Sequence, residues 1–357
     1  MHLFPQLLLL ASIIQISLIW STSATPLLLP SIGLKSEIEA SSEGYETVLP
    51  LESRDVKHSW WPFKKYDIPK GKQKSPKVYR VGANWWGRGG YKLELGPELG
   101  SGAYGTVTEA TLYNNTHPEI EVATKKSKGY DMISGAILMK EVQDLSPYIL
   151  PTISYFFVPG KPTTYWLVMP KRGMGNLFEV RRRTRLGMTR KVQLFRKLLD
   201  GLATMHHHGI AHRDLKLTNI LMEDMDTPQW ADFDAATKNK TISSFFGSNG
   251  HVSPGITQVK DHSPKSDDIF AAMMTFFWLT ANDDSPGRLW EAIKKGEVEK
   301  SQLPDKIRKY IYGPSNEMVD VAADCLCKES EGRLDIDQLI ERFESTPEYQ
   351  DSLEMEC

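Results

Sequence analysis

Cysteine is scarce in this sequence, with three residues in a chain of 357: Cys325, Cys327 and Cys357. A small secreted domain built on a disulfide framework needs a far higher density, so that class is excluded. Cys325 and Cys327 lie two positions apart on an expected helix, point in different directions and are poorly placed to pair with each other. The protein must therefore be stabilised by a packed core.

An excess of charge is also missing. The 43 Lys and Arg residues nearly balance the 45 Asp and Glu residues, which leaves a formal net charge of -2. Such a chain has no general attraction to nucleic acid or to an acidic membrane, so any electrostatic partner must act on a local patch. With 40% hydrophobic and 25% charged residues, the composition is that of an ordinary globular protein.

Long apolar runs are absent except at the start, where residues 7–20 are nearly unbroken apolar sequence. This run is short for a membrane span of about 20 residues. Small residues at Thr22 and Ala24 suit signal peptidase, although no Lys or Arg precedes the run. We expect a signal peptide over residues 1–24, with no stable membrane insertion after its cleavage. An uncleaved anchor is the alternative. The mature protein would be secreted, stay in the secretory lumen or be delivered into host cells.

Residues 25–90 are rich in Ser, Pro, Glu and Lys and show no sustained helix or strand period, which predicts a linker or N-terminal extension. The second half is basic and carries the pairs Trp60-Trp61 and Trp85-Trp86. Aromatic residues among positive charges can bind single-stranded nucleic acid or a membrane interface. Because the segment is short and lacks a nucleic-acid motif, we favour packing of the Trp rings on the domain that follows. No nucleic-acid partner is expected.

The residues after Gly90 change to strand-like and then helix-like periods. Alternating or short apolar runs predict strands at 91–99, 106–112, 121–126, 153–158 and 164–169, with one helix among them at 136–145. Spacings of three to four predict further helices at 191–206, 267–279, 289–295, 316–327 and 336–344. We therefore expect an α+β domain over residues 91–345, a small β-rich lobe before a larger helical lobe, and a C-terminal tail over 346–357.

A glycine-rich turn stands between the first two of these strands. Gly100, Gly102 and Gly105 would let backbone amides approach phosphate oxygens without interference from a Cβ, although a hairpin without a ligand has the same pattern. Lys125 follows on a strand, and Glu141 lies about one short helix downstream, where its carboxylate could pair with the Lys125 amine. A glycine-rich loop, a strand lysine and a helix glutamate in this order resemble the eukaryotic protein kinase family.

The strongest signal is the run 211–221, Ala-His-Arg-Asp-Leu-Lys-Leu-Thr-Asn-Ile-Leu, which matches the kinase catalytic loop at every defining position. The resemblance implies that Asp214 orients the attacking hydroxyl and accepts its proton. Lys216 would neutralise charge on the transferred phosphoryl group, and Asn219 would bind magnesium. A lysine two residues after the aspartate resembles Ser/Thr kinases rather than tyrosine kinases.

Asp232-Phe233-Asp234 stands where the family has its metal-binding DFG triplet. Asp232 would hold magnesium, and Phe233 would pack under the helix that bears Glu141. Aspartate replaces glycine at position 234. If that position needs a positive φ, the cost is about 1 to 2 kcal/mol, which predicts altered loop dynamics or slower turnover rather than a dead site.

The resemblance also implies a complete nucleotide site, with ATP in the cleft between the lobes. Met169 and Lys171 belong to the segment that meets adenine through backbone groups. The residues expected to contact the nucleotide are Leu99, Gly100, Gly102, Gly105, Val107, Ala123, Lys125, Met169, Lys171 and Leu221. Asn219 and Asp232 would be the metal ligands, and Asp214, Lys216, Lys125 and Glu141 the catalytic residues.

The segment after residue 234 departs from the family. Ser248 replaces the usual threonine, and Gly255 replaces a glutamate, so Arg333 loses its usual partner and is expected to use Asp261 or Asp335 instead. If Arg333 is buried without a partner, the cost is about 3 to 5 kcal/mol.

Further acidic and hydroxyl residues fit this scheme. Asp268 is interpreted as the acid that anchors the catalytic loop, or alternatively as a helix cap. Arg213 could pair with a phosphate on the activation segment, where the candidate acceptors are Thr237, Thr241, Ser243 and Ser244.

Together these features predict a protein kinase that transfers the γ-phosphoryl group of ATP to Ser or Thr of a protein substrate. A secreted pseudokinase that binds nucleotide or protein is the alternative, supported by Asp234 and Gly255. A kinase for small molecules is disfavoured by Lys216 and by the docking segment around Ser248.

Overall fold

The computed structural model describes residues 72–75, 78–81, 91–102, 105–113, 119–242, 246–254, 262–296, 298–311, 313–327 and 332–354. The predicted signal peptide and both Trp pairs lie outside these ranges, as do Ser243, Ser244, Gly255 and Asp261. Within them, no helix is long and apolar enough to cross a membrane.

The first lobe is a seven-stranded antiparallel sheet with the strand order β1-β2-β3-β4-β5-β7-β6. All five predicted strands are present, with ends shifted by a few residues. Their bounds, with those of two further strands, are Lys72–Ser75 (β1), Val78–Val81 (β2), Tyr91–Gly102 (β3), Gly105–Tyr113 (β4), Ile120–Ser127 (β5), Ser154–Val158 (β6) and Thr164–Pro170 (β7).

Strands β1 and β2 lie within residues 25–90, the predicted linker or N-terminal extension, where no strand was predicted. β2 pairs with β3, and Tyr79 on it is buried, with its ring centroid 4.5 Å from that of Trp166. Four-residue strands are too short to stand out as a period in the sequence. β2 is held by pairing with β3, and β1 by pairing with β2. Residues 72–75 and 78–81 are therefore part of the sheet.

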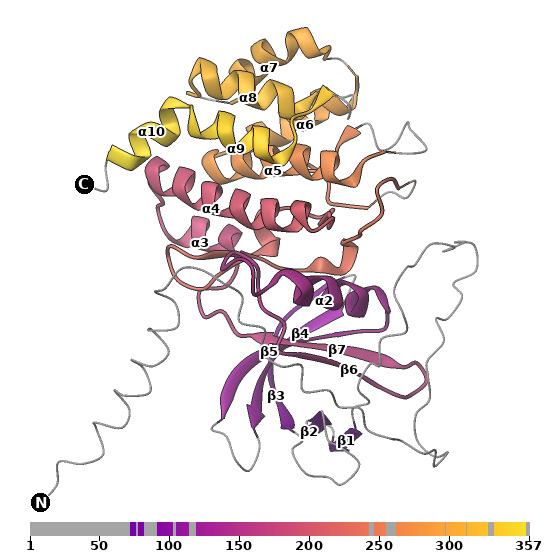
Figure 1. The fold of residues 1–357 in the computed structure, drawn as a ribbon. Helices are drawn as coiled ribbons and strands as arrows, with labels where there is room; N and C mark the ends of the chain where they lie inside the picture. Colours follow the sequence, from indigo (N-terminus) through magenta and orange to yellow (C-terminus); the bar gives the residue numbers. More distant parts are fainter. Residues whose placement is uncertain are drawn as a thin grey trace, which may run out of the picture. The chain divides into compact units, whose positions relative to one another are not determined.

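One helix, α2 (Asp131–Val142), lies beside the sheet, between it and the helical lobe (Figure 1). It replaces the helix predicted at 136–145 and begins earlier, at Asp131. A β-carbon added to Gly135 would lie 2.2 Å from the carbonyl oxygen of Phe233. The backbone of α2 therefore lies against the backbone of the turn η2 (Phe233–Ala235).

The second lobe is helical and follows β7 in the chain (Figure 1). Its helices are Leu177–Arg183 (α3), Met188–His207 (α4), Pro264–Thr280 (α5), Ser285–Lys294 (α6), Leu303–Tyr310 (α7), Asn316–Leu326 (α8), Ile336–Glu344 (α9) and Pro347–Glu354 (α10). A hairpin of β8 (Ile220–Met222) and β9 (Pro228–Trp230) follows the turn η1 (Leu217–Asn219). The five helices predicted beyond Leu177 are present, whereas α3, α7 and α10 were not predicted.

Helix α10 lies within the predicted C-terminal tail over 346–357, where no helix was predicted. Gln193 of α4 donates a hydrogen bond of 3.0 Å to the carbonyl oxygen of Ser352, and the ring of Tyr349 contacts that of Phe343. Residues 347–354 thus pack on the helical lobe.

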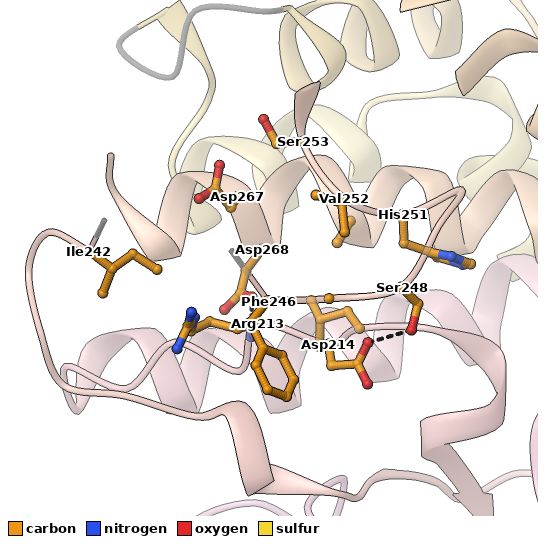
Figure 2. A pocket seen from close by; sticks show the side chains of 13 residues that line it. Arg213, Asp214, Ile242, Phe246, Ser248, His251, Val252, Ser253, Asp267 and Asp268 are labelled. Atoms are coloured by element: carbon orange, nitrogen blue, oxygen red, sulfur yellow. Dashed lines mark hydrogen bonds between the residues drawn. The ribbon is translucent and has the colours of Figure 1, made fainter. Parts of the chain in front are cut away.

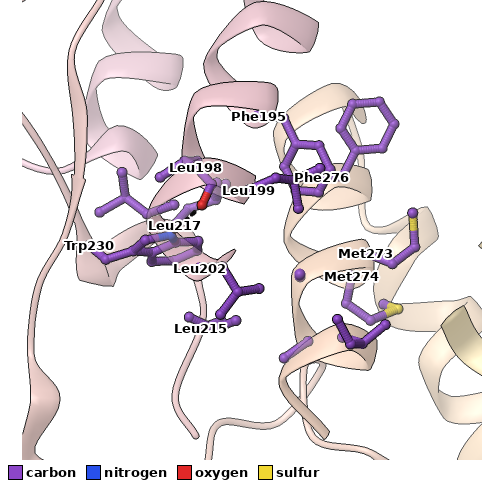
Figure 3. Packing of buried hydrophobic residues seen from close by; sticks show 14 of the residues in the cluster. Phe195, Leu198, Leu199, Leu202, Leu215, Leu217, Trp230, Met273, Met274 and Phe276 are labelled. Atoms are coloured by element: carbon purple, nitrogen blue, oxygen red, sulfur yellow. Dashed lines mark hydrogen bonds between the residues drawn. The ribbon is translucent and has the colours of Figure 1, made fainter. Parts of the chain in front are cut away.

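The core of this lobe lies between α4 and α5 (Figure 3). Phe195 of α4 and Phe276 of α5 bring their ring centroids within 4.7 Å. Trp230 of β9 belongs to the same buried cluster, and its Nε1 donates to the carbonyl oxygen of Leu198 on α4 over 2.8 Å. Because α4, α5 and β9 are joined in this way, the loop between α4 and β8 rests on a rigid base.

Candidate active site

The loop between α4 and β8 is held in place by hydrogen bonds to Asp268 on α5. This residue on α5 is fully buried, and it accepts hydrogen bonds of 2.7 Å from the backbone amides of His212 and Arg213 and one of 3.0 Å involving His206 Nε2. Ser263, not Asp268, caps α5. The loop-anchor interpretation of Asp268 is confirmed.

We expect Asp268→Asn to destabilise the protein by about 1 to 3 kcal/mol, because an amide cannot accept all three bonds and leaves a buried backbone donor unsatisfied. Urea unfolding of the variant and the wild type measures this loss. Ser263→Ala should cost about 1 kcal/mol through loss of the cap alone. Equal stability of Asp268→Asn and the wild type would contradict the anchor role.

Asp214 lies at the centre of a hydrogen-bonded cluster. Its two carboxylate oxygens contact Lys216 Nζ at 2.6 Å and Ser248 Oγ at 2.8 Å, and Lys216 Nζ also donates to Ser248 Oγ over 2.7 Å. Asn219 Nδ2 donates to both the side chain and the backbone carbonyl of Asp214 at 2.9 Å. Figure 2 shows Asp214 and Ser248 facing each other across this contact. The structure thus brings together Asp214, Lys216, Asn219 and Ser248.

Asn219 and Asp232 carry the oxygen ligands that magnesium prefers. The described hydrogen bonds of the Asn219 side chain use its amide nitrogen, which leaves the side-chain oxygen for a metal ion. The backbone amide of Ala231 donates to the carbonyl oxygen of Asn219 over 2.9 Å, which places Asp232 next to it. Across the described ranges no three His, Cys, Asp or Glu side chains form a metal cage. A site with two protein ligands fits a metal that is also bound by phosphates.

The predicted ion pair between Lys125 and Glu141 is wrong. Lys125 Nζ lies 2.8 Å from Asp232 Oδ1 and 2.8 Å from Asp234 Oδ2, whereas Glu141 pairs with Lys238. Glu141 lies on the exposed side of α2, so the helix turns its carboxylate away from Lys125. Glu141 lies at a suitable distance from Lys125 along the chain, but on the face of α2 that does not meet Lys125.

The positive φ considered for position 234 occurs elsewhere. Asp232 has φ 64° and Arg213 has φ 70°, whereas Asp234 lies within the turn η2. The backbone cost expected for aspartate at position 234 therefore does not apply. Left-handed backbone at two non-glycine residues is strained, and such strain gathers at functional sites.

The carboxyl groups around Lys125 differ in acidity. Burial by itself would raise the pKa of Asp232, but the Lys125 ammonium holds it below its usual value. Burial and the negative charge of Asp232 raise the pKa of Asp234 to about 6. Asp232 is thus the carboxylate that stays ionised, as a metal ligand must be.

The predicted nucleotide contacts line up across the sheet. Gly100 on β3 lies opposite Val107 on β4, which lies opposite Lys125 on β5, and Ala123 lies opposite Met169 on β7. Gly105 has φ 146°, and a β-carbon there would lie 2.3 Å from the carbonyl oxygen of Lys126, so this turn position requires glycine.

The remaining nucleotide candidates flank this arrangement at both ends. Leu99 is 51% exposed on β3, and Gly102 closes the turn opposite Gly105. Lys171, after β7, forms ion pairs with Glu109 and Glu121. Leu221 lies on β8, bridged to Asn176.

The partner of Arg333 is Asp267, which corrects the expectation of Asp335. Arg333 Nη1 lies 3.2 Å from Asp267 Oδ1 and donates to the carbonyl oxygen of Ser266 at 3.0 Å, while its Nε donates to that of Cys327 at 2.9 Å. Asp335 instead caps α9. Asp267 on α5 thus provides Arg333 with the carboxylate that the family has at position 255.

The activation segment is the part of the chain that follows Asp234 and leads to position 255. Two of its described residues contact Arg213. The Arg213 Nη1 donates to the carbonyl oxygen of Ala235, and the guanidinium lies over the ring of Phe246. Thr237 is buried and forms a backbone bridge with Ala211, so it is not accessible for phosphorylation in this conformation. Thr241 is exposed, and its phosphorylation stays a prediction.

Comparison with known proteins identifies the arrangement. The protein kinase domain family matches residues 93–343, which is more than half of the chain. The chain belongs to the protein kinase family. The two lobes and the anchored catalytic loop between them are those of a kinase.

Similar kinases are distant and mostly longer. Mouse NUAK family SNF1-like kinase 1 is 27% identical over 194 residues, which cover 53% of this chain and 30% of that protein. Serine/threonine-protein kinase TAO3 of Xenopus laevis is 32% identical over 169 residues, covering 46% and 18%. Mitogen-activated protein kinase kinase kinase 1a of Physcomitrium patens is 25% identical over 329 residues, covering 86% and 41%. Each match spans less than half of the relative's length.

Proposed function

We propose that the protein is an active Ser/Thr protein kinase that transfers the γ-phosphoryl group of ATP, with magnesium, to a protein substrate. The cluster around Asp214 carries the proposal. A carboxylate held by Lys216, Asn219 and Ser248 is positioned to orient a substrate hydroxyl and to accept its proton during attack on phosphorus. Lys216 beside it suits neutralisation of the transferred phosphoryl group.

The specificity for Ser and Thr is supported by Lys216 and Ser248, which fill the positions that Ser/Thr kinases use. The names of the similar kinases above are consistent with it. Entry into the secretory pathway is proposed from residues 1–24 alone. Amino-terminal sequencing of the mature protein tests that part.

Asp214→Ala is expected to lower phosphoryl transfer by about 10²- to 10⁴-fold, because it removes the proton acceptor. Transfer of radiolabelled phosphate from ATP to a generic protein substrate, followed by phosphoamino acid analysis, measures rate and specificity together. Equal transfer by wild type and variant would refute catalysis at this site. Labelled tyrosine alone would refute Ser/Thr specificity.

A secreted pseudokinase is the second candidate, favoured by one observation: Lys125 is paired with Asp232 and Asp234 and not with the α2 glutamate. Two results together would support it: magnesium-ATP raises the unfolding temperature of the protein, and no phosphoryl transfer that depends on Asp214 is detected.

A further inference from the structure

Lys125 is held by two carboxylates that come from one short segment. Its Nζ is 2.8 Å from an oxygen of Asp232 and 2.8 Å from one of Asp234. The side chain of Lys125 is 8% exposed and that of Asp234 is 9% exposed, so this contact is shielded from water. Removing one charge from a buried pair has a large effect, because the remaining charge loses its compensation.

Helix α2 offers no carboxylate to this lysine. Where α2 meets the 232–235 segment it presents Gly135, with so little space that a β-carbon would lie 2.2 Å from the carbonyl oxygen of Phe233. Glu141 lies six residues further on, about 240° around the helix axis, and pairs with Lys238. Both partners of Lys125 therefore come from the 232–235 segment and none from α2.

We propose that Asp234 positions Lys125 for the nucleotide, in place of a carboxylate on α2. The inference rests on the proposed function for its catalytic consequence. Asp232 would also be the residue that holds the metal ion, and part of its charge would then be neutralised by that ion. Asp234 then remains to hold the ammonium. In this arrangement the position of Lys125 depends on the 232–235 segment and not on the rotation of α2.

The surroundings of Asp234 fit this role. Lys125 faces it from β5, Asp232 lies two residues away on its own segment, and α2 presents the Gly135 backbone.

Asp234→Gly is the decisive variant, because it restores the residue that the family has at this position. If Asp234 were only a tolerated substitution, activity would stay equal or rise. We expect kcat/KM for ATP to fall roughly 10- to 100-fold in Asp234→Gly and in Asp234→Asn through misplacement of Lys125. Asp234→Glu should recover part of the loss relative to Asp234→Gly.

Two substitutions on α2 complete the set. Asp131→Asn is the matched control, an exposed carboxylate in the first turn of α2. Glu141→Gln breaks only the contact with Lys238 and is expected to change kcat/KM less than about twofold, far below the effect of misplacement. Thermal unfolding of each variant verifies that it is folded. A loss in Glu141→Gln as large as that in Asp234→Asn would overturn the proposal.

A measurement without turnover separates this proposal from the proposed function. Asp234 supplies one of the two carboxylate oxygens that lie 2.8 Å from Lys125 Nζ. Asp234→Asn should therefore free Lys125 Nζ from one of its two ion pairs and speed acylation of Lys125 by an amine-reactive ester, read by peptide mass spectrometry. Faster labelling with an inactive wild type would refute the kinase activity alone. Unchanged labelling, or full activity of Asp234→Gly, would overturn the role of Asp234.

Discussion

Asp232→Asn is expected to lower kcat by on the order of 10³-fold or more. The substitution keeps the size of the side chain but removes the charge that would hold the cation and one of the two charges around Lys125. A metal ion supplies several kcal/mol of charge stabilisation to phosphoryl transfer, and each 1.36 kcal/mol is a factor of ten in rate. Initial rates measured against magnesium concentration give both the loss and the shift in metal requirement.

Asp224→Asn is a suitable control for this variant, since Asp224 is an exposed carboxylate in the turn of the β8–β9 hairpin that leads to Asp232. Its kinetics should match the wild type. Turnover of Asp232→Asn within tenfold of the wild type, at an unchanged magnesium requirement, would remove Asp232 from the metal site.

The catalytic loop was predictable because its chemistry is contiguous. Asp214, Lys216 and Asn219 lie within six residues, and their mutual contacts follow from local backbone geometry. The same holds for the five strands and for the larger helices, whose periods are read within one segment. Strands β1 and β2 were missed because four residues hold too little of a period, and their pairing depends on β3.

The partners of Lys125 and Arg333 were not predictable in this way, because both are chosen by tertiary packing. Glu141 stands at a suitable chain position, but the close contact of Gly135 with the 232–235 segment sets which face of α2 meets the site. Asp267 is separated from Arg333 by 66 residues, and the sequence around it gives no sign of this contact. The two departures from the family pattern thus correspond to two ion pairs between residues far apart in the chain. Asp234, in place of glycine, pairs with Lys125, and Asp267 pairs with Arg333, which lacks the usual glutamate at position 255.

Arg333→Met is expected to destabilise the protein by about 3 to 5 kcal/mol, since it leaves Asp267 buried without its cation. The Arg333 side chain is fully buried and also contacts Ser253 Oγ, and His262 Nε2 lies 3.2 Å from the second Asp267 oxygen. Methionine keeps most of the volume, which limits the contribution of a cavity. Urea unfolding at pH 7 measures the change.

The pair can be isolated with Asp267→Asn and the double variant. Because each single substitution leaves one buried group uncompensated, the double variant should be more stable than the sum of the two losses predicts, by about 0.5 to 3 kcal/mol. Strict additivity would show that Arg333 acts through the carbonyl oxygens of Ser266 and Cys327 and not through Asp267.

The pH dependence of the Arg333→Met loss follows from Asp267. Burial raises the pKa of Asp267 to about 6 despite Arg333, which lowers it. An acid with a raised pKa binds more protons when folded, so its contribution to the unfolding free energy falls as the pH rises from about 4 to about 6. Without Arg333 the pKa of Asp267 is higher still, and this fall continues above pH 6. The stability gap between wild type and Arg333→Met should therefore be small at pH 5 and widen toward pH 8, whereas a gap independent of pH would mean that Asp267 is not the group left uncompensated.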